Sequence, residues 1–169
     1  RRQRQMCIRD RYSAMAQFNT KEEFMEGNLF DFIEEYAMNI LNRSDRLKVQ
    51  VVRSDTEGIE MKFVPQNIAI ILDNVVSNST KYNANELRVL LGKDEKQYTI
   101  DFIDDGDGVS SDIADLNELF EFGKGYTLTG TGVGLYHIKD IVEKDLQGTV
   151  TIESEPQKGF ALHVRFGKV

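Results

Sequence analysis

The chain has 169 residues and a formal net charge of -7, and this length suits one domain. Hydrophobic residues make up 40% and charged residues 29%, a balance typical of globular proteins. No stretch approaches the roughly 18 consecutive apolar residues that a membrane span needs. A single cysteine excludes an internal disulfide framework and a cysteine-rich zinc site.

Charge is unevenly placed along the chain. Residues 1–12 (RRQRQMCIRDRY) carry five Arg and one Asp, a net charge of +4, whereas residues 13–169 carry 16 basic and 27 acidic residues, a net charge of -11. An acidic body repels nucleic-acid phosphates, so we expect no nucleic-acid partner. We interpret residues 1–12, which resemble translated adapter sequence, as a non-native or disordered leader, 13–27 as a linker remnant and 28–169 as one domain.

Hydrophobic periodicity predicts helices that alternate with pairs of strands. Asn28 is a suitable cap for the first helix, Pro65 suits the first turn of the second, and DTEG marks a turn between the first two strands. The expected helices cover 28–42, 66–81 and 132–145, with a short one near 112–119, and the expected strands cover 47–52, 59–63, 86–91, 97–103, 149–154 and 159–166. This order predicts an α/β fold, namely a two-layer α/β sandwich whose mixed, largely antiparallel sheet is covered by helices on one face.

The second helix carries an unusual polar stripe. Asn74, Asn78 and Lys81 follow one another at i, i+4 and i+7, so they share one helix face. Asn amide oxygens are neutral ligands for Mg²⁺, which also takes substrate phosphates and waters as ligands. Lys81 would add positive charge for those phosphates. A solvated surface stripe is the alternative interpretation.

Two glycine motifs follow. In IDDGDGV, residues 103–109, a strand ends in Asp104, whose carboxylate can accept from an exocyclic amine such as that of adenine. The alternatives are an acidic turn or part of a calcium loop, although the EF-hand spacing is incomplete. In GTGVGL, residues 130–135, glycines free backbone N–H groups at a helix N-terminus, which suits phosphate. Here a flexible loop is the alternative, because neither the dinucleotide fingerprint nor the P-loop spacing is met.

Taken in order, ILDNVVSNSTKY, IDDGDGV, LFEFGKG and GTGVGL resemble the four boxes of the catalytic ATP-binding domain of sensor histidine kinases. That family belongs, with DNA gyrase B, Hsp90 and MutL, to the group whose nucleotide site is called the Bergerat fold. The resemblance covers about residues 28–167. It implies ATP and Mg²⁺ as cofactors and the same two-layer α/β sandwich.

The resemblance also implies individual roles. Asn78 would ligate Mg²⁺, Asn74 would lie beside the site, Lys81 would contact phosphate, Tyr82 would pack near the adenine, and Asp104 would accept from the adenine N6 amine. Asn74, Asn78 and Lys81 are therefore the expected catalytic residues. Three further parts complete the expected nucleotide site: the backbone at the DxGxG glycines, the F box that hinges a lid over 123–131, and the phosphate loop. Their expected residues are Gly106 and Gly108 in the first, Phe120 and Phe122 in the F box with Lys124 in the lid, and Gly130, Thr131, Gly132, Val133, Gly134 and Leu135 in the phosphate loop.

Position 74 bears on the reaction. In the ATP-hydrolysing members of this group, the residue four before the magnesium asparagine is a Glu that activates water. Here it is Asn74, whose amide cannot act as a general base at neutral pH. Asp73 is adjacent, but one residue along a helix turns its side chain by about 100°. The resemblance therefore implies an ATP-dependent protein histidine kinase that transfers a phosphoryl group rather than hydrolysing ATP.

Two positions depart from the family pattern: Ser79 replaces the usual Ala after the magnesium asparagine, and Gly159–Phe160 replaces a common Gly–Thr pair. Neither His137 nor His163 has the helical context of a phosphoacceptor. We therefore expect a catalytic half whose partners are a histidine-bearing dimerisation domain and a response regulator. We also expect a cytoplasmic domain without membrane contact, and a homodimeric full-length protein. The alternatives are a related serine kinase or ATPase, and a nucleotide-binding module without catalysis.

Overall fold

The computed structural model describes residues 23–43, 45–121 and 133–169. The elements follow in the order β1 (Met25–Asn28), α2 (Leu29–Asn39), η1 (Leu41–Arg43), β2 (Lys48–Arg53), β3 (Glu60–Phe63), α3 (Pro65–Lys81), β4 (Glu86–Lys93), β5 (Tyr98–Asp104), η2 (Leu116–Phe120), α4 (Gly134–Asp145), β6 (Thr149–Ser154) and β7 (Phe160–Phe166). The expected leader over 1–12, and residues 13–22 of the expected linker, lie outside these ranges.

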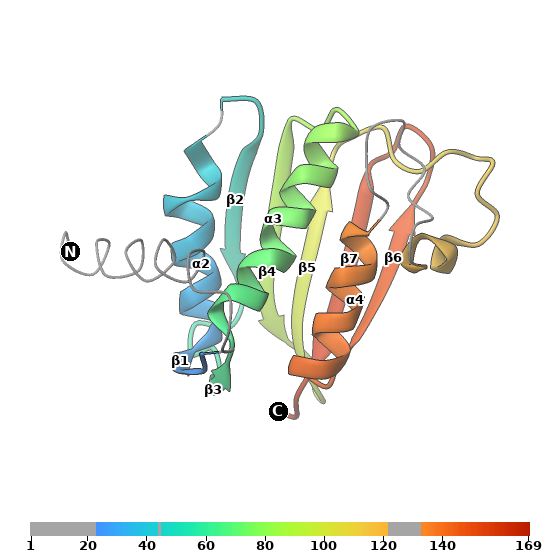
Figure 1. Ribbon diagram of the computed structural model, residues 1–169. Coiled ribbons are helices and arrows are strands. Elements are labelled where there is room, and N and C mark those ends of the chain that lie inside the picture. Colours follow the sequence, from blue (N-terminus) through green and yellow to red (C-terminus); the bar gives the residue numbers. More distant parts are fainter. Residues whose placement is uncertain (1–22, 44, 122–132) are drawn as a thin grey trace.

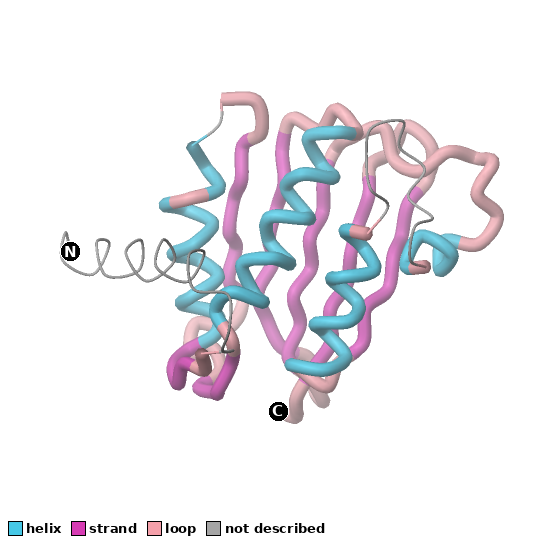
Figure 2. Tube along the Cα trace, viewed as in Figure 1, coloured by secondary structure: helices cyan, strands magenta, loops and turns pink. Residues whose placement is uncertain are grey.

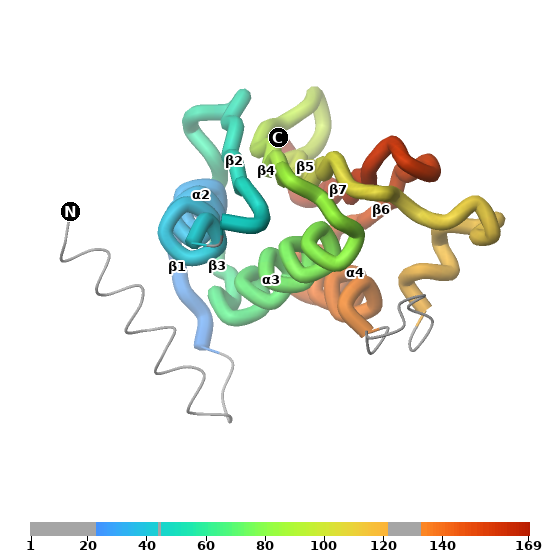
Figure 3. The backbone as a smooth tube through the Cα atoms, turned by 90° about the horizontal axis from the view of Figure 1, so that it is seen from above, coloured from blue at the N-terminus to red at the C-terminus, as the bar shows by residue number. Residues whose placement is uncertain are grey.

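Five strands form the main sheet, in the order β2-β4-β5-β7-β6. The β2–β4 pair is parallel, and the three other pairs are antiparallel. Helices α2, α3 and α4 lie side by side over one face of this sheet, as the ribbon and the view from above show (Figures 1 and 3). The two-layer α/β sandwich with a mixed, largely antiparallel sheet is thus confirmed.

The helices begin where local chemistry favours a start. The Asn28 side chain accepts from the backbone N–H groups of Phe30 and Asp31, both at 3.1 Å, and so caps α2. Pro65 occupies the first turn of α3, where its missing N–H costs nothing. The colouring by secondary structure shows the three long helices lying over the strands (Figure 2).

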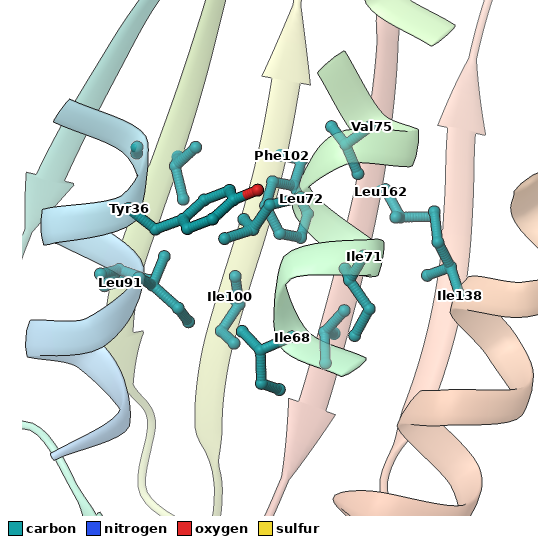
Figure 4. Close-up of a cluster of buried hydrophobic side chains, with 14 of the residues drawn as sticks. Tyr36, Ile68, Ile71, Leu72, Val75, Leu91, Ile100, Phe102, Ile138 and Leu162 are labelled. Atoms are coloured by element: carbon teal, nitrogen blue, oxygen red, sulfur yellow. The ribbon is translucent and has the colours of Figure 1, made fainter. Parts of the chain in front are cut away.

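A single core fills the space between the helices and the sheet. Strand alternation directs Leu87, Val89 and Leu91 of β4 toward the helices, and each is at most 2% exposed. Side chains of α3 lie between this helix and the strands (Figure 4), and Ile68, Ile71, Leu72 and Val75 are all buried. The site described below is therefore built on a packed frame.

The start of the domain differs from the sequence-based expectation. Met25–Asn28 forms β1 and pairs antiparallel with β3 in a separate two-stranded sheet, so three residues of the expected linker, 25–27, belong to the fold. The DTEG segment connects β2 and β3 as bends, and these two strands do not pair with each other; β2 pairs instead with β4. The sequence MEGN is too short to show the alternation of apolar and polar residues that predicts a strand, so β1 was not expected. The pairing of β2 was not expected either, because its parallel partner β4 follows α3 in the sequence.

Leu72→Ala tests the core. Leu72 is 1% exposed and lies in the α3 face that covers the sheet (Figure 4). Removing three buried carbons leaves a cavity, so the free energy of unfolding should fall by about 2–5 kcal/mol in urea denaturation followed by circular dichroism. The matched control is Met38→Ala, at a helix position that is 52% exposed, with an expected change below about 0.5 kcal/mol. Equal losses from the two variants would contradict this packing.

Candidate functional site

A pocket opens at the end of the sheet where β5 stops and β7 begins, at the upper end of α3 in Figure 1. Side chains from α3, β4, β5, β7 and the first turn of α4 line it. They are Val75, Asn78, Ser79, Leu87, Phe102, Asp104, Leu135, Phe160 and Leu162. Most are apolar; the polar ones are Asn78, Ser79 and Asp104, and Ser79 is hydrogen-bonded to the Asp104 carboxylate.

Asp104 is the polar centre of the pocket. It is 8% exposed, and its Oδ1 accepts from two backbone N–H groups, that of Gly106 at 3.0 Å and that of Phe160 at 3.2 Å. Its Oδ2 accepts from the Ser79 hydroxyl at 2.7 Å. A carboxylate oxygen has two lone pairs, so Oδ1 is fully used while Oδ2 keeps one acceptor position. That position suits a ligand N–H group.

The DxGxG loop packs backbone against backbone. A Cβ on Gly106 would lie 2.6 Å from the carbonyl oxygen of Tyr82, and the N–H of Asp107 donates to that same oxygen at 2.8 Å. Gly108 has a φ of +71°, and a Cβ there would meet the Glu155 carbonyl. The two glycines therefore let the loop close on the end of α3 and on the β6–β7 turn. Whether they also approach a ligand remains a prediction.

The polar stripe of α3 divides into three environments. Asn78 lines the pocket, and Lys81 is exposed in the last turn. Asn74 is partly buried; its Nδ2 donates to the Ile70 carbonyl at 2.9 Å, and its Oδ1 lies beside Gly134 at the start of α4, 3.0 Å from where a Cβ would be. Of the three, Asn78 alone borders the pocket, while Asn74 lies at the contact between α3 and α4.

Asp73 lies on another side of α3. Its Oδ1 accepts from the Tyr36 hydroxyl of α2 at 2.8 Å. Partial burial raises the pKa of Asp73, and the hydrogen bond from Tyr36 opposes that rise. The 100° turn expected between neighbouring helix residues thus directs this carboxylate to α2 rather than to the pocket.

Four further expected residues lie in the described part of the chain, each in a different setting. Leu135 lines the pocket from the first turn of α4, and partial burial raises the pKa of Tyr82 at the end of α3. Phe120 is 4% exposed and packs in the core, with the Lys139 ammonium 5.5 Å from its ring centroid. Val133 precedes α4 and accepts through its carbonyl from the His137 N–H at 2.9 Å. The remaining expected residues, Phe122, Lys124, Gly130, Thr131 and Gly132, lie outside the described residues.

Sequence reasoning missed the apolar walls of the pocket, and it gave Ser79 no role. The walls come from Val75, Leu87, Phe102, Phe160 and Leu162. Strand alternation marks most of them as core positions, but it does not tell a packed core position from a pocket wall. For Ser79 a signal existed, because a small polar residue stands on the apolar side of α3 next to Asn78.

Neither histidine lines the pocket. His163 is on the sheet face opposite Leu162, with its Nδ1 2.6 Å from Asp101 Oδ1. Arg165 shares that same carboxylate oxygen at 2.7 Å. His137 is exposed on α4.

Solved structures of histidine kinase domains share this fold. The catalytic domain of histidine kinase ThkA has a TM-score of 0.69 at 18% identity, covering 86% of this chain and 96% of its own. The ATP binding domain of PrrB from Mycobacterium tuberculosis has a TM-score of 0.65 at 19% identity, covering 86% of this chain and 98% of its own.

Two curated relatives match in sequence. Sensor protein kinase PilS of Pseudomonas aeruginosa is 28% identical over 142 residues, which are 80% of this chain and 26% of the relative. Heme sensor protein HssS of Staphylococcus saprophyticus is 27% identical over 158 residues, which are 87% of this chain and 34% of the relative. This chain thus spans about a quarter to a third of the length of these relatives.

The family model described as histidine kinase-, DNA gyrase B-, and HSP90-like ATPase matches residues 63–168. That range begins just before α3 and includes β4, β5, α4 and β7, and these five elements carry the residues that line the pocket. With well over half of its length matched, the chain belongs to the family of histidine kinase-, DNA gyrase B-, and HSP90-like ATPases and is an ATP-binding domain.

Proposed function

We propose that this chain is the catalytic domain of a two-component sensor histidine kinase, which binds ATP and transfers its γ-phosphoryl group to a histidine on a separate dimerisation domain. One observation carries the proposal: the buried Asp104 carboxylate is held by three donors and keeps one acceptor position on a pocket-lining side chain. The family and the kinase relatives agree with it.

The adenine would enter the apolar pocket with its N6 amine toward Asp104. Apolar walls suit the faces of a purine, and a carboxylate suits an amine that carries two hydrogens. Phe160 replaces the Thr of the family's Gly–Thr pair and therefore offers the site no hydroxyl. Its backbone N–H instead donates to Asp104 and helps to hold that carboxylate in place. The Asp104 carboxylate would thus be the hydrogen-bond acceptor that recognises the adenine.

The phosphates would extend toward Asn78, Lys81 and the start of α4. The Asn78 amide oxygen fits Mg²⁺ that is held mainly by phosphate oxygens and waters, a common arrangement for this ion. Among the described residues no group of three His, Cys, Asp or Glu side chains could form a cage by itself, so the phosphates would have to complete the shell. Bound Mg²⁺ supplies charge neutralisation for the phosphates, and Lys81 adds to it.

Transfer is favoured over hydrolysis because the site offers water no general base on α3. The Asn74 amide cannot take a proton at neutral pH, and its Nδ2 is engaged with the Ile70 carbonyl. Asp73 is turned to Tyr36. A related ATP-hydrolysing clamp is the second candidate, since the family includes such ATPases.

The proposed partners are a histidine-bearing dimerisation domain, which would make the full-length protein a homodimer, and a response regulator. The curated relatives carry the names of a sensor protein kinase and a heme sensor. We propose a cytoplasmic position for the domain, without membrane contact of its own. Within residues 23–43, 45–121 and 133–169, no helix has the length and apolarity to cross a bilayer.

Asp104→Asn tests the adenine contact. The two backbone donors on Oδ1 should hold the amide oxygen there and place the Nδ2 hydrogens where Oδ2 now accepts. Donors would then face the N6 amine, and affinity for a non-hydrolysable ATP analogue should fall at least about tenfold in calorimetry. Asp112→Asn, in the exposed segment after β5, is the control and should bind as the wild type does. Undiminished binding by Asp104→Asn would contradict the assignment.

Asn78→Ala tests the metal contact. With Mg²⁺ present, affinity for the ATP analogue should fall about tenfold or more, while affinity in EDTA should change by less than about threefold, because only the metal-bound state uses the amide. Asn39→Ala, the same substitution in α2, should leave both affinities unchanged. Equal losses with and without Mg²⁺ would assign Asn78 a role other than metal binding.

Phosphate release separates the kinase from the clamp. Given ATP and Mg²⁺ but no acceptor, the wild-type chain should release phosphate no faster than Asn78→Ala, because Asn74 cannot activate water. Addition of a dimerisation domain such as that of a PilS-like kinase should yield acid-labile, base-stable label on that domain. Steady phosphate release without any acceptor would instead favour the ATP-hydrolysing clamp.

A further inference from the structure

We propose that Ser79 is a specificity-determining residue: its hydroxyl hydrogen is committed to Asp104, so this edge of the pocket offers only hydrogen-bond acceptors and selects a 6-amino purine over a 6-keto purine. This inference rests on the proposed nucleotide function and deepens it. It concerns a side chain for which the family resemblance predicts no role, because Ala is the usual residue at this position.

The hydrogen bond of Ser79 is unusual for a serine inside a helix. Such hydroxyls commonly donate to the carbonyl four residues earlier in their own helix. The next residue does this, since the Thr80 hydroxyl donates to the Val76 carbonyl at 2.9 Å. Ser79, which is 1% exposed, instead donates at 2.7 Å to Asp104 on β5. The hydroxyl thus links α3 to the sheet at the wall of the pocket.

Ser79 is the side chain that donates to Oδ2, the second oxygen of the Asp104 carboxylate. The two backbone donors both bind Oδ1, from Gly106 and Phe160. These two bonds hold Oδ1 and, with it, the plane of the carboxylate, because rotation about the Cβ–Cγ bond would move Oδ1 away from both donors. The bond from Ser79 occupies one acceptor position of Oδ2 and leaves the other for a ligand.

The same bond sets the polarity of the pocket edge. A serine hydroxyl has one hydrogen, and here that hydrogen is committed to Asp104. Ser79 Oγ and Asp104 Oδ2 can therefore offer only lone pairs to a ligand. An exocyclic amine matches two neighbouring acceptors, whereas a keto oxygen at that position would meet acceptors and stay unpaired. Sites built to bind a hydrogen-bond donor reject analogues that lack it.

Alanine at position 79 would change this edge without removing Asp104. The lost oxygen leaves room beside Oδ2, and a water can occupy the space. Unlike the fixed Ser79–Asp104 pair, a water can point a hydrogen at a keto oxygen. The pocket should then still bind adenine nucleotides but discriminate less against 6-keto purines.

The test compares affinities of the full chain for non-hydrolysable analogues of ATP and ITP, whose bases differ at the 6-position in amine against keto oxygen. The wild type should prefer the ATP analogue, and Ser79→Ala should reduce that preference at least about fivefold. Ser79→Cys keeps a side chain of similar size with a weaker donor and should give an intermediate ratio. Thr80→Ala removes the neighbouring hydroxyl, which is bonded within its own helix, and should keep the wild-type ratio.

The ratio of the two affinities separates a specificity role of Ser79 from a structural one, because a loss of packing would weaken the binding of both analogues to the same extent. An unchanged ATP-to-ITP ratio in a folded Ser79→Ala chain, checked by thermal unfolding, would overturn the inference while leaving the nucleotide site in place. Absence of any preference in the wild type would overturn the proposed adenine site, and this inference with it.

Discussion

Asp104 ends β5 with a buried carboxylate, and such a group is costly in a protein interior unless its oxygens accept hydrogen bonds. Here the donors come from three parts of the chain: the loop after β5, the start of β7, and α3. The hydrogen bonds to this one carboxylate therefore align the end of α3 with the sheet and hold the DxGxG loop next to both. The pocket exists because these three segments meet at one carboxylate.

The rest of the molecule supports that meeting point. The apolar faces of α3 and α4 pack on the same side of the sheet, and Gly134 allows the start of α4 to lie against Asn74. The first turn of α4 thereby closes one wall of the pocket. Asp73, one residue before Asn74, holds α2 through Tyr36 instead. Helix α3 thus carries the structural carboxylate of Asp73 on one face, and the residues proposed to contact Mg²⁺ and the adenine on another.

Much of this arrangement could be predicted from the sequence, and the exceptions share a cause. The start of α2 at Asn28, the placement of Asp104 at a strand end and the helix after the glycine loop follow from local signals. The pairing of β1 with β3 could not be predicted, because a four-residue strand lacks periodicity. The pocket walls read as ordinary core, and the Ser79–Asp104 bond joins residues 25 positions apart. Contacts that depend on tertiary packing leave little trace in local sequence.

In the proposed complex, Asp104 accepts a hydrogen bond from the 6-amino group of the purine with the lone pair that its three protein donors leave free. A crystal structure of the chain with a non-hydrolysable ATP analogue and Mg²⁺ tests it most directly. We predict the adenine N6 within hydrogen-bond distance of Asp104 Oδ2, with the Ser79, Gly106 and Phe160 contacts retained. A bound analogue whose base lies outside this pocket, or whose N6 points away from Asp104, would contradict this mode of adenine recognition.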